Sequence, residues 1–591
     1  MQHVFARTLG LLFLASMPAA FGQMACTASA PSPANLRATG STELTGDLIV
    51  SCRGGTPVTS GALPTVNITL FFNTAVTSRV LVPAVASIPP TPAITEALLI
   101  IDSPTPTEQR PCVTATCNAT DNVFQGRLDS FNSLSFSNIP VNPPGPNADR
   151  LFRFRNLRVN ANNLSTGSAA FVFVSMTGGG IASVANQQQT VGVVRQAVNF
   201  ELRTGADAAL TTPIALTACT GYNIDLANNN AAPAYSAPGG RTMLVKFSEA
   251  SGFQNAFKKR SYNTTVNDPQ ATFPQDSPGF NYNTESGHTN PLFPATNGLN
   301  RAGVADSGTI LRAQFVNVPA GVKIFVGTRE LAAGSTVDGS QNPTTRARLT
   351  SSPGQPFTAT APDSQLEGGL KLVPASGDVS WEVLETDVNT VETVAFVVVV
   401  AYSNSPQPAA ATISALGGFA PQSTSAVATA GDPVPRYLGL IGPTPAVNLN
   451  ACRTTLLFQF LTNQAGFDTG VAVSNTSRDT LGTATQTGRC TATFFPTPNN
   501  PQTQAQFPAL SSPTLNGGEQ WTFTVSGARP GFQGYMMVNC DFQFAHGYAF
   551  ISDFGSKNLA QGYQALVIPD RTRLADPVTT AAPGTGEQLI H

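Results

Sequence analysis

Charged side chains are scarce in this sequence. Of the 591 residues only 11% are charged, and the 32 basic residues almost balance the 34 acidic ones. About a quarter of a soluble chain is usually charged, and a formal net charge of -2 creates no field that would attract phosphate or an anionic bilayer. Nucleic acid is therefore not an expected partner. Because 41% of the residues are hydrophobic, most of the chain should nevertheless fold.

Histidine is almost missing as well. His3 lies in the N-terminal segment and His591 is the last residue, which leaves His288 and His546. A Ser-His-Asp triad or a two-histidine metal site would need one or both of them, and the sequence contains no G-x-S-x-G, H-E-x-x-H, P-loop or EF-hand motif. We expect His288 to lie in a solvated loop and interpret His546 as a structural histidine. We therefore expect no catalytic, cofactor-binding or metal-ligating residue.

An enzyme that uses only carboxylates as catalytic groups is an alternative. A glycosidase needs only two acidic side chains, held about 5 or 9 Å apart. No spacing in this sequence singles out a pair. The nearest candidates are Glu382, Glu385, Asp387, Asp541 and Asp553.

Helical patterns are also rare, because the 46 Pro and 51 Gly interrupt most windows that could carry an apolar stripe at helical spacing. Alternation is common instead: in residues 65–72 an apolar residue stands at every second position. A single core stops growing near roughly 250 to 300 residues, so several domains are expected. The sequence predicts an all-β protein of tandem immunoglobulin-like β-sandwich domains stapled by disulfides.

The first 22 residues show the three parts of a secretory signal peptide. Arg7 closes a short basic start, an apolar run follows, and Ala20 and Gly22 are small residues at cleavage spacing. The run is too short, and too soon interrupted by Pro18, to span a membrane. A buried N-terminal helix is the alternative. We expect an exported protein, secreted or at the cell surface.

All cysteines follow this segment, and an even number in an exported chain favours disulfides over thiols or zinc. Spacing alone does not determine the pairing. Proximity and strand phase favour bonds of Cys26 with Cys52 and of Cys490 with Cys540, and Cys112 and Cys117 close a tight loop that we interpret as a staple. Cys219 and Cys452 are then left to each other.

The C-terminal pair should connect two layers. Cys490 and Cys540 each stand in the inward phase of a separate predicted strand. We expect them to bridge facing sheets of a sandwich.

Boundaries follow from composition and loop signals. We expect a signal peptide at residues 1–22 and, after it, four further parts. These are an N-terminal β-sandwich region (23–202), a middle β-rich region with long loops (203–435), a C-terminal β-sandwich module (437–570) and a flexible tail (571–591). The long loops are either functional or disordered.

The most apolar stretch of the exported chain is at residues 391–402. It is too short for a membrane helix, and its valines favour a strand that is buried on both faces. No later segment is long and apolar enough for a transmembrane helix.

Residues 150–159 combine phenylalanines with arginines at alternating positions, after which the apolar phase shifts by one residue. The shift predicts a β-bulge between Arg155 and Leu157. We interpret the arginines as a solvated strand face, with an anion-binding strip as the alternative. They are Arg150, Arg153, Arg155 and Arg158.

Two C-terminal segments carry a resemblance: TTLLFQFLTNQAGFDTGVAVSNTS at 454–477 and GFQGYMMVNCDFQFAHGYAFISDFG at 531–555. They resemble segments that recur in exported, β-rich proteins of soil bacteria without an assigned activity. The resemblance implies export and a shared C-terminal module, and it supplies no catalytic residue.

These observations favour a non-catalytic structural or adhesive protein at or beyond the bacterial cell surface. Its expected partners are further copies of itself, added through open sandwich edges, or an extracellular polymer. The first alternative is a carbohydrate-binding protein or polysaccharide-degrading enzyme on the same scaffold, which exposed Tyr or Trp beside two carboxylates would favour. A protease or esterase that uses His546 is the second.

Overall fold

The computed structural model describes most of the chain between residues 23 and 568. The expected signal peptide, the tail and Cys219 lie outside the described residues. The described part omits residues 87–90, 114–115, 219–241, 261–283, 291, 295, 332–346, 359–369, 388, 403–407, 426, 482–484, 501–502 and 557.

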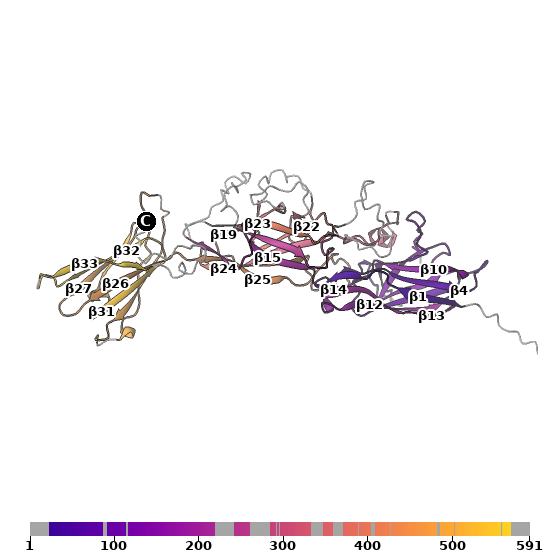
Figure 1. Ribbon diagram of the computed structural model, residues 1–591, viewed down its shortest axis with the longest axis horizontal. Helices are drawn as coiled ribbons and strands as arrows, with labels where there is room; N and C mark the ends of the chain where they lie inside the picture. The colour runs from indigo at the N-terminus through magenta and orange to yellow at the C-terminus, as the bar shows by residue number, and fades with distance from the viewer. Residues whose placement is uncertain are drawn as a thin grey trace, which may run out of the picture.

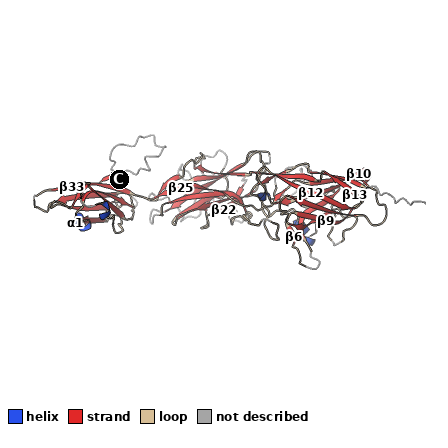
Figure 2. Ribbon diagram, turned by 90° about the horizontal axis from the view of Figure 1, so that it is seen from below, coloured by secondary structure: helices blue, strands red, loops and turns tan. Residues whose placement is uncertain are grey.

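The fold is all-β, as predicted, and consists of sandwich-like pairs of sheet layers around three separate cores. The cores follow one another along the long axis of the molecule, from the N-terminal region at one end to the C-terminal region at the other (Figure 1). Strands dominate every part, and the α-helix α1 (Val525–Ala528) has only one turn (Figure 2). Among the described helices, none is long and apolar enough to cross a membrane.

The N-terminal core lies inside a twelve-stranded sheet that runs in the order β13-β1-β4-β10-β7-β8-β9-β5-β12-β14-β2, with β6 beside β7. β5 shows why it forms: the inward side chains Val66, Ile68, Leu70 and Phe72 are buried in alternation, as predicted. The strands are β1 (Met24–Ser29), β2 (Ala34–Arg37), β4 (Leu48–Gly54), β5 (Thr65–Phe72), β6 (Val80–Val82), β7 (Ala93–Ile101), β8 (Val123–Ser130), β9 (Ser133–Pro140), β10 (Gly145–Arg155), β12 (Ala169–Gly178), β13 (Ile181–Ala185) and β14 (Gln188–Arg195); β3 (Glu43–Leu44) pairs with β11 (Arg158–Val159), and η1 (Ala161–Asn163) is a 3-10 turn.

The middle core lies between the sheets β15-β17-β23-β19-β21 and β16-β25-β24-β18-β22-β20. Residues 391–402 contain β23, whose side chains enter this core on one face and a smaller apolar cluster on the other, as predicted. The elements are β15 (Val198–Thr204), β16 (Ile214–Thr217), β17 (Met243–Glu249), η3 (Thr296–Arg301), β18 (Ile310–Val316), β19 (Val322–Gly327), β20 (Ala347–Leu349), β21 (Leu370–Leu372), β22 (Asp378–Val383), β23 (Thr393–Tyr402), β24 (Ala411–Ala420) and β25 (Ile441–Asn450).

The C-terminal core lies between the sheets β29-β28-β31-β26-β34 and β30-β27-β32-β33. Besides α1, its elements are β26 (Thr454–Thr462), β27 (Asp468–Asn475), β28 (Cys490–Pro496), η4 (Gln504–Gln506), β29 (Leu510–Ser511), β30 (Gln520–Thr524), β31 (Gln533–Cys540), β32 (Ala545–Ser552), β33 (Ala560–Gln564) and β34 (Leu566–Ile568).

The cores are divided at slightly different positions from those expected. The expected division after residue 202 falls within β15, which pairs with β17 along its whole length. Similarly, β25 follows the expected division near residue 436 but pairs with β16 and β24 of the middle region.

Three of the expected disulfides are present. Cys26 bonds to Cys52, Cys112 to Cys117 and Cys490 to Cys540. Cys452 is also disulfide-bonded, and its expected partner lies outside the described residues.

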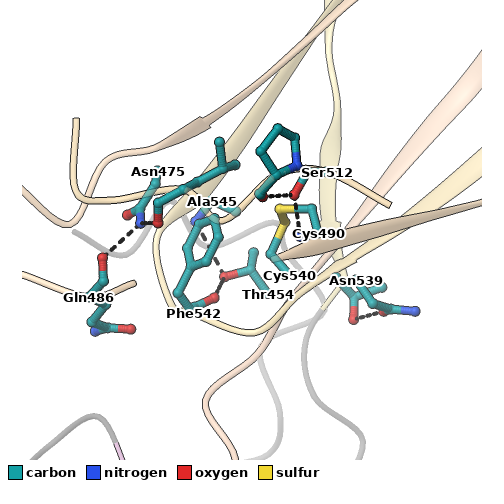
Figure 3. The surroundings of a disulfide bond; sticks show 12 residues. Thr454, Asn475, Gln486, Cys490, Ser512, Asn539, Cys540, Phe542 and Ala545 are labelled. Atoms are coloured by element: carbon teal, nitrogen blue, oxygen red, sulfur yellow. Dashed lines mark hydrogen bonds between the residues drawn. A yellow bond between two sulfur atoms is a disulfide. The ribbon is translucent and has the colours of Figure 1, made fainter. Parts of the chain in front are cut away.

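The expectation that Cys490 and Cys540 bridge facing sheets is wrong. They are direct register partners on neighbouring strands, β28 and β31, of one sheet, with Cα atoms 3.9 Å apart. An inward phase places a side chain in the core without saying which sheet carries its partner. Figure 3 shows this bond beside Ser512, whose Oγ accepts a 2.8 Å hydrogen bond from the Cys490 amide.

The predicted bulge is replaced by a break between two strands. β10 ends at Arg155, Asn156 adopts a left-handed conformation with φ 55°, and β11 then starts at Arg158 in a different sheet. The apolar phase does shift, since Leu157 and Val159 are buried, but a turn at Asn156 produces the shift.

Candidate functional site

Two segments of the middle region lie against the N-terminal sandwich. The described residues of the segment 284–306 reach β7, where Phe293 and Leu299 form an apolar cluster with Leu98 and Ile100. This segment is therefore packed as a core element, although it belongs by sequence to an Asn-rich and Pro-rich loop.

Residues 434–438 of the middle region contact the loop that follows β2. The amide of Ser41 donates to the carbonyl of Arg436 at 2.9 Å, and the amide of Leu438 donates to the carbonyl of Thr39 at 2.8 Å. Together with residues 284–306, this contact forms the interface that we call the charged joint, because buried ions occupy its centre.

Arg37, the last residue of β2, is at the centre of the charged joint and is 1% exposed. Its Nε lies 2.9 and 3.0 Å from the carboxylate oxygens of Glu43 in its own region. Its two terminal nitrogens donate to the two oxygens of Glu285 in the middle region, at 2.6 and 2.9 Å. A bidentate guanidinium-carboxylate pair fixes both distance and orientation, so this contact aligns the two regions.

Other groups complete the coordination of Arg37. One terminal nitrogen donates to Thr309 Oγ1 at 3.1 Å and to the Ala256 carbonyl at 3.2 Å. The centre of the guanidinium lies 4.9 Å from the centroid of the Tyr437 ring, within cation-π range, and the Tyr437 hydroxyl donates to Glu285 at 3.2 Å. Every charge in this group is thus paired.

Arg158 makes a second connection across the charged joint. Its Nε donates to Glu96 Oε1 at 2.8 Å within the N-terminal region, and a terminal nitrogen donates to the backbone carbonyl of Glu285 at 2.5 Å. The other oxygen of Glu96 accepts from the amide of Gly303 at 3.0 Å. Since Arg158 and Glu96 are both fully buried, they are shielded from water and salt.

The opposite charges of the charged joint stabilise one another and offset the free-energy cost of removing them from water. Burial alone would raise the pKa of Glu285, but the charge and hydrogen bonds of Arg37 prevail and lower it to about 2. Burial would also lower the pKa of Arg37, which Glu285 and Glu43 instead raise well above its ordinary value. Lys258 has a lowered pKa because it is buried and lies near Arg37. The site therefore contains a network of mutually dependent ions.

The interpretation of the arginine strand as a solvated face is wrong for three of its four members. Arg153, Arg155 and Arg158 are at most 3% exposed. Asp47 pairs with Arg153 and Arg155 at the end of β10, whereas Arg158 of β11 binds Glu96 and the backbone of the middle region. Arg150 is partly exposed and pairs with Asp102.

His288 lies in the charged joint and not in a solvated loop as expected. Its Nδ1 is 2.7 Å from a terminal nitrogen of Arg155, and its amide donates to Asn156 Oδ1 at 2.7 Å. Burial, together with the charges of Arg155 and Arg153, keeps the pKa of His288 well below its ordinary value. Its ring is therefore a neutral packing element of the charged joint.

The candidate glycosidase acids have structural partners instead. Glu382 is buried and accepts from the amide of Gly308 at 2.6 Å, and burial raises its pKa. Asp553 accepts from the amide of Gly555 at 3.0 Å in the turn after β32. Glu385 is largely exposed and lies 3.9 Å from Lys259 Nζ.

The two remaining candidate acids and His546 occupy ordinary positions. Asp387 Oδ1 accepts from the amide of Asn389 at 2.9 Å, and Asp541 follows the end of β31 on the surface. His546 is half-buried on β32 opposite Ser474 of β27.

Sequence reasoning did not single out four ions of the charged joint, Arg37, Glu43, Glu96 and Glu285, or the neutral Tyr437 beside them. Only one signal in the sequence pointed toward them. In a chain with 11% charged residues, an acid or a base close to apolar positions is itself unusual and indicates a buried pair.

No protein-family model matches the chain, and the comparison with curated proteins gives no match. Among solved structures, the chain is similar to a serine-rich repeat adhesion glycoprotein of Streptococcus agalactiae, with 7% identity, 71% of this chain and 96% of that chain covered, and a TM-score of 0.16. It is also similar to the T6 backbone pilin of serotype M6 Streptococcus pyogenes (6% identity, 92% and 80% covered, TM-score 0.19). A third is the major pilin SpaD of Corynebacterium diphtheriae (8% identity, 89% and 86% covered, TM-score 0.17).

Proposed function

We propose that this chain is an exported, non-catalytic structural or adhesive protein that acts at or beyond the bacterial cell surface. The charged joint carries the proposal. Interfaces between domains of one chain usually permit relative motion. Here a bidentate ion pair between Arg37 and Glu285 is fully buried between two sandwiches, so any other orientation would leave buried charges without partners.

A rigid connection of this kind suits a spacer. The first two cores lie end to end along the molecule, and the C-terminal core continues the row (Figure 1). A stiff row of sandwiches holds its ends at a constant separation, which is what a stalk or a fibre subunit requires. Self-association by strand addition at the sheet edges β29, β30, β33 and β34 is the accompanying hypothesis.

The test uses the chain from Gln23 onward, purified with its disulfides intact. Small-angle scattering should give an elongated particle whose profile is unchanged between 0.1 and 1 M salt, because the ions of the charged joint are buried. Electron microscopy of concentrated protein should show end-to-end polymers, and assays with a glycan panel should show no hydrolysis. A compact or salt-dependent profile, or hydrolysis of any sugar, would remove the proposal.

Carbohydrate binding is the second candidate function, and one observation favours it. The two tryptophans and Tyr437 are buried in cores, but Tyr548 and Phe550 are each 46% exposed on the C-terminal module. Exposed aromatic rings can stack on sugar rings, so this pair supports adhesion through carbohydrate binding.

A further inference from the structure

The sheet β30-β27-β32-β33 of the C-terminal module has an outer face with a column of planar side chains on β32. His546, Tyr548 and Phe550 occupy successive outward positions of β32, and Tyr548 and Phe550 are its exposed members. Same-face residues of a strand stand about 7 Å apart. The three residues thus stand in one column along β32, an interior strand of this sheet.

The Tyr548 ring lies across the sheet and not upright from it. A Cβ atom added to Gly562 of the neighbouring strand β33 would lie 1.7 Å from Tyr548 Oη and 2.6 Å from its Cζ. The hydroxyl end of the ring therefore lies over the backbone at Gly562, and Tyr548 as a whole is 46% exposed. An aromatic ring that leans along a sheet and stays partly exposed can stack on the ring of a ligand.

A bare strip of backbone adjoins Phe550 on its other side. Gly470 of β27 is the register partner of Phe550, and a Cβ atom placed there would meet nothing nearer than the Phe550 carbonyl oxygen at 3.9 Å. Thr524 of β30 stands beyond Gly470. The aromatic column is thus followed by a shallow shelf with a hydroxyl-bearing residue at its far side.

The three rows of outward positions that include His546, Tyr548 and Phe550 contain no Asp, Glu, Lys or Arg. The next outward position, Asp468, is buried and accepts from the Ser526 amide at 2.9 Å. The other outward residues of the three rows are small or carry hydroxyl or amide groups. They are Gln520, Thr522, Thr524, Ala472, Ser474 and Gln564.

From this combination we infer that the outer face of β30-β27-β32-β33 binds a neutral polysaccharide. The apolar faces of sugar rings stack on aromatic rings, and their hydroxyls exchange hydrogen bonds with hydroxyl and amide side chains. The inference deepens the proposed adhesive function, on which it rests, because it names the class of polymer and the module that contacts it.

The size of the face favours a narrow chain over a protein. Four strands and three rows of side chains span about 14 by 13 Å. A stable protein partner usually covers about 800 Å² on each side, several times this area. An extended sugar chain that lies along the column is narrow enough to be bound by a face of this size.

Two changes test the face by different means. Tyr548→Ser with Phe550→Ser removes both rings. Gly470→Val keeps them but fills the shelf with a side chain that suits a strand, and the open space at Gly470 indicates that this variant folds. Tyr535→Ser is the matched control, because Tyr535 is 42% exposed on the opposite sheet of the same module.

The full mature chain and its variants are run in affinity electrophoresis against soluble β-glucan, xylan, mannan and dextran. We expect at least one polysaccharide to retard the unmodified chain and the control equally, and binding to weaken at least about tenfold in both face variants. If no polysaccharide retards the unmodified chain, or if the face variants bind as it does, the inference is wrong. Small-angle scattering on the same samples measures the elongated shape separately. An error in the proposed scaffold function can therefore be distinguished from an error in the proposed binding face.

Discussion

Replacement of Arg37 by Met should weaken the charged joint far more than the loss of an ordinary ion pair would. The side chain makes six hydrogen bonds, to Glu43, Ala256, Glu285 and Thr309. Met fills a similar volume but leaves two carboxylates buried without their cation. Removal of one partner from a buried ion pair costs about 3 to 5 kcal/mol, and we expect a loss of this size in the free energy of unfolding.

The two tryptophans make the measurement simple. Trp381 lies in the middle core and Trp521 in the C-terminal core, so each reports on a different module. In urea, with a slope of roughly 3 kcal/mol per M, the Trp381 transition should move down by about 1 M in the Arg37→Met variant. The Trp521 transition should not move, because the C-terminal core contains no residue of the charged joint.

Two further variants decide whether the ion pair is the cause. Arg53→Met breaks the exposed Arg53–Asp149 pair and should leave both transitions in place. The double variant Arg37→Met with Glu285→Gln removes one cation and one anion, so its loss should be smaller than the sum of the two single losses by on the order of 2 kcal/mol. An Arg37→Met shift no larger than that of Arg53→Met, or additive losses in the double variant, would refute the reasoning.

Three further changes test other parts of the structure. Replacement of Cys490 and Cys540 by Ala opens a loop with a sequence separation of 50 and should destabilise the C-terminal module by at most about 4 kcal/mol, seen only in the Trp fluorescence of that module. Burial raises the pKa of Glu249 on β17 from 4.5 to about 7, so the folded state binds the proton more tightly. Stability of the middle region should fall by on the order of 2 kcal/mol from this group as pH rises from 4.5 to 7, and calorimetry should show a smaller fall for Glu249→Gln, in which only other groups such as Glu382 still titrate. Asn156→Ala should cost about 3 kcal/mol, because Asn156 accepts from the His288 amide and donates to the His288 carbonyl; a melting temperature equal to that of the unmodified chain would contradict this.

Local features of the fold could be predicted from the sequence. The alternation in residues 65–72 and the apolar run at 391–402 became β5 and β23, because side-chain direction in a strand has a period of two and depends on no distant residue. The inward phase of Cys490 and Cys540 predicted their bond for the same reason. Their common sheet was not predicted, since strand order is a property of the whole chain.

The charged joint could not be predicted, because it depends on contacts between distant segments. Arg37 and Glu285 are separated by 248 positions. An arginine that alternates with phenylalanine has the same pattern on a solvated face as on a face that another region covers, as Arg153 and Arg155 show. The exposed column on β32 was equally hidden, because an outward aromatic side chain and a buried one look alike in a short strand.

Replacement of the whole ion cluster, instead of one member, separates stability from orientation. If Arg37, Glu43, Glu285 and the nearby buried Lys258 are all changed to Met or Leu, no charge of this cluster is left buried without a partner, and stability should stay level or rise by about 1 to 4 kcal/mol. Apolar contacts have no preferred direction, however, so the two sandwiches should sample a wider range of angles. We therefore expect a quadruple variant that unfolds no earlier in urea but scatters as a more flexible particle. A stable variant with the scattering profile of the unmodified chain would show that shape complementarity at Phe293 and Leu299, and not the ion network, aligns the modules.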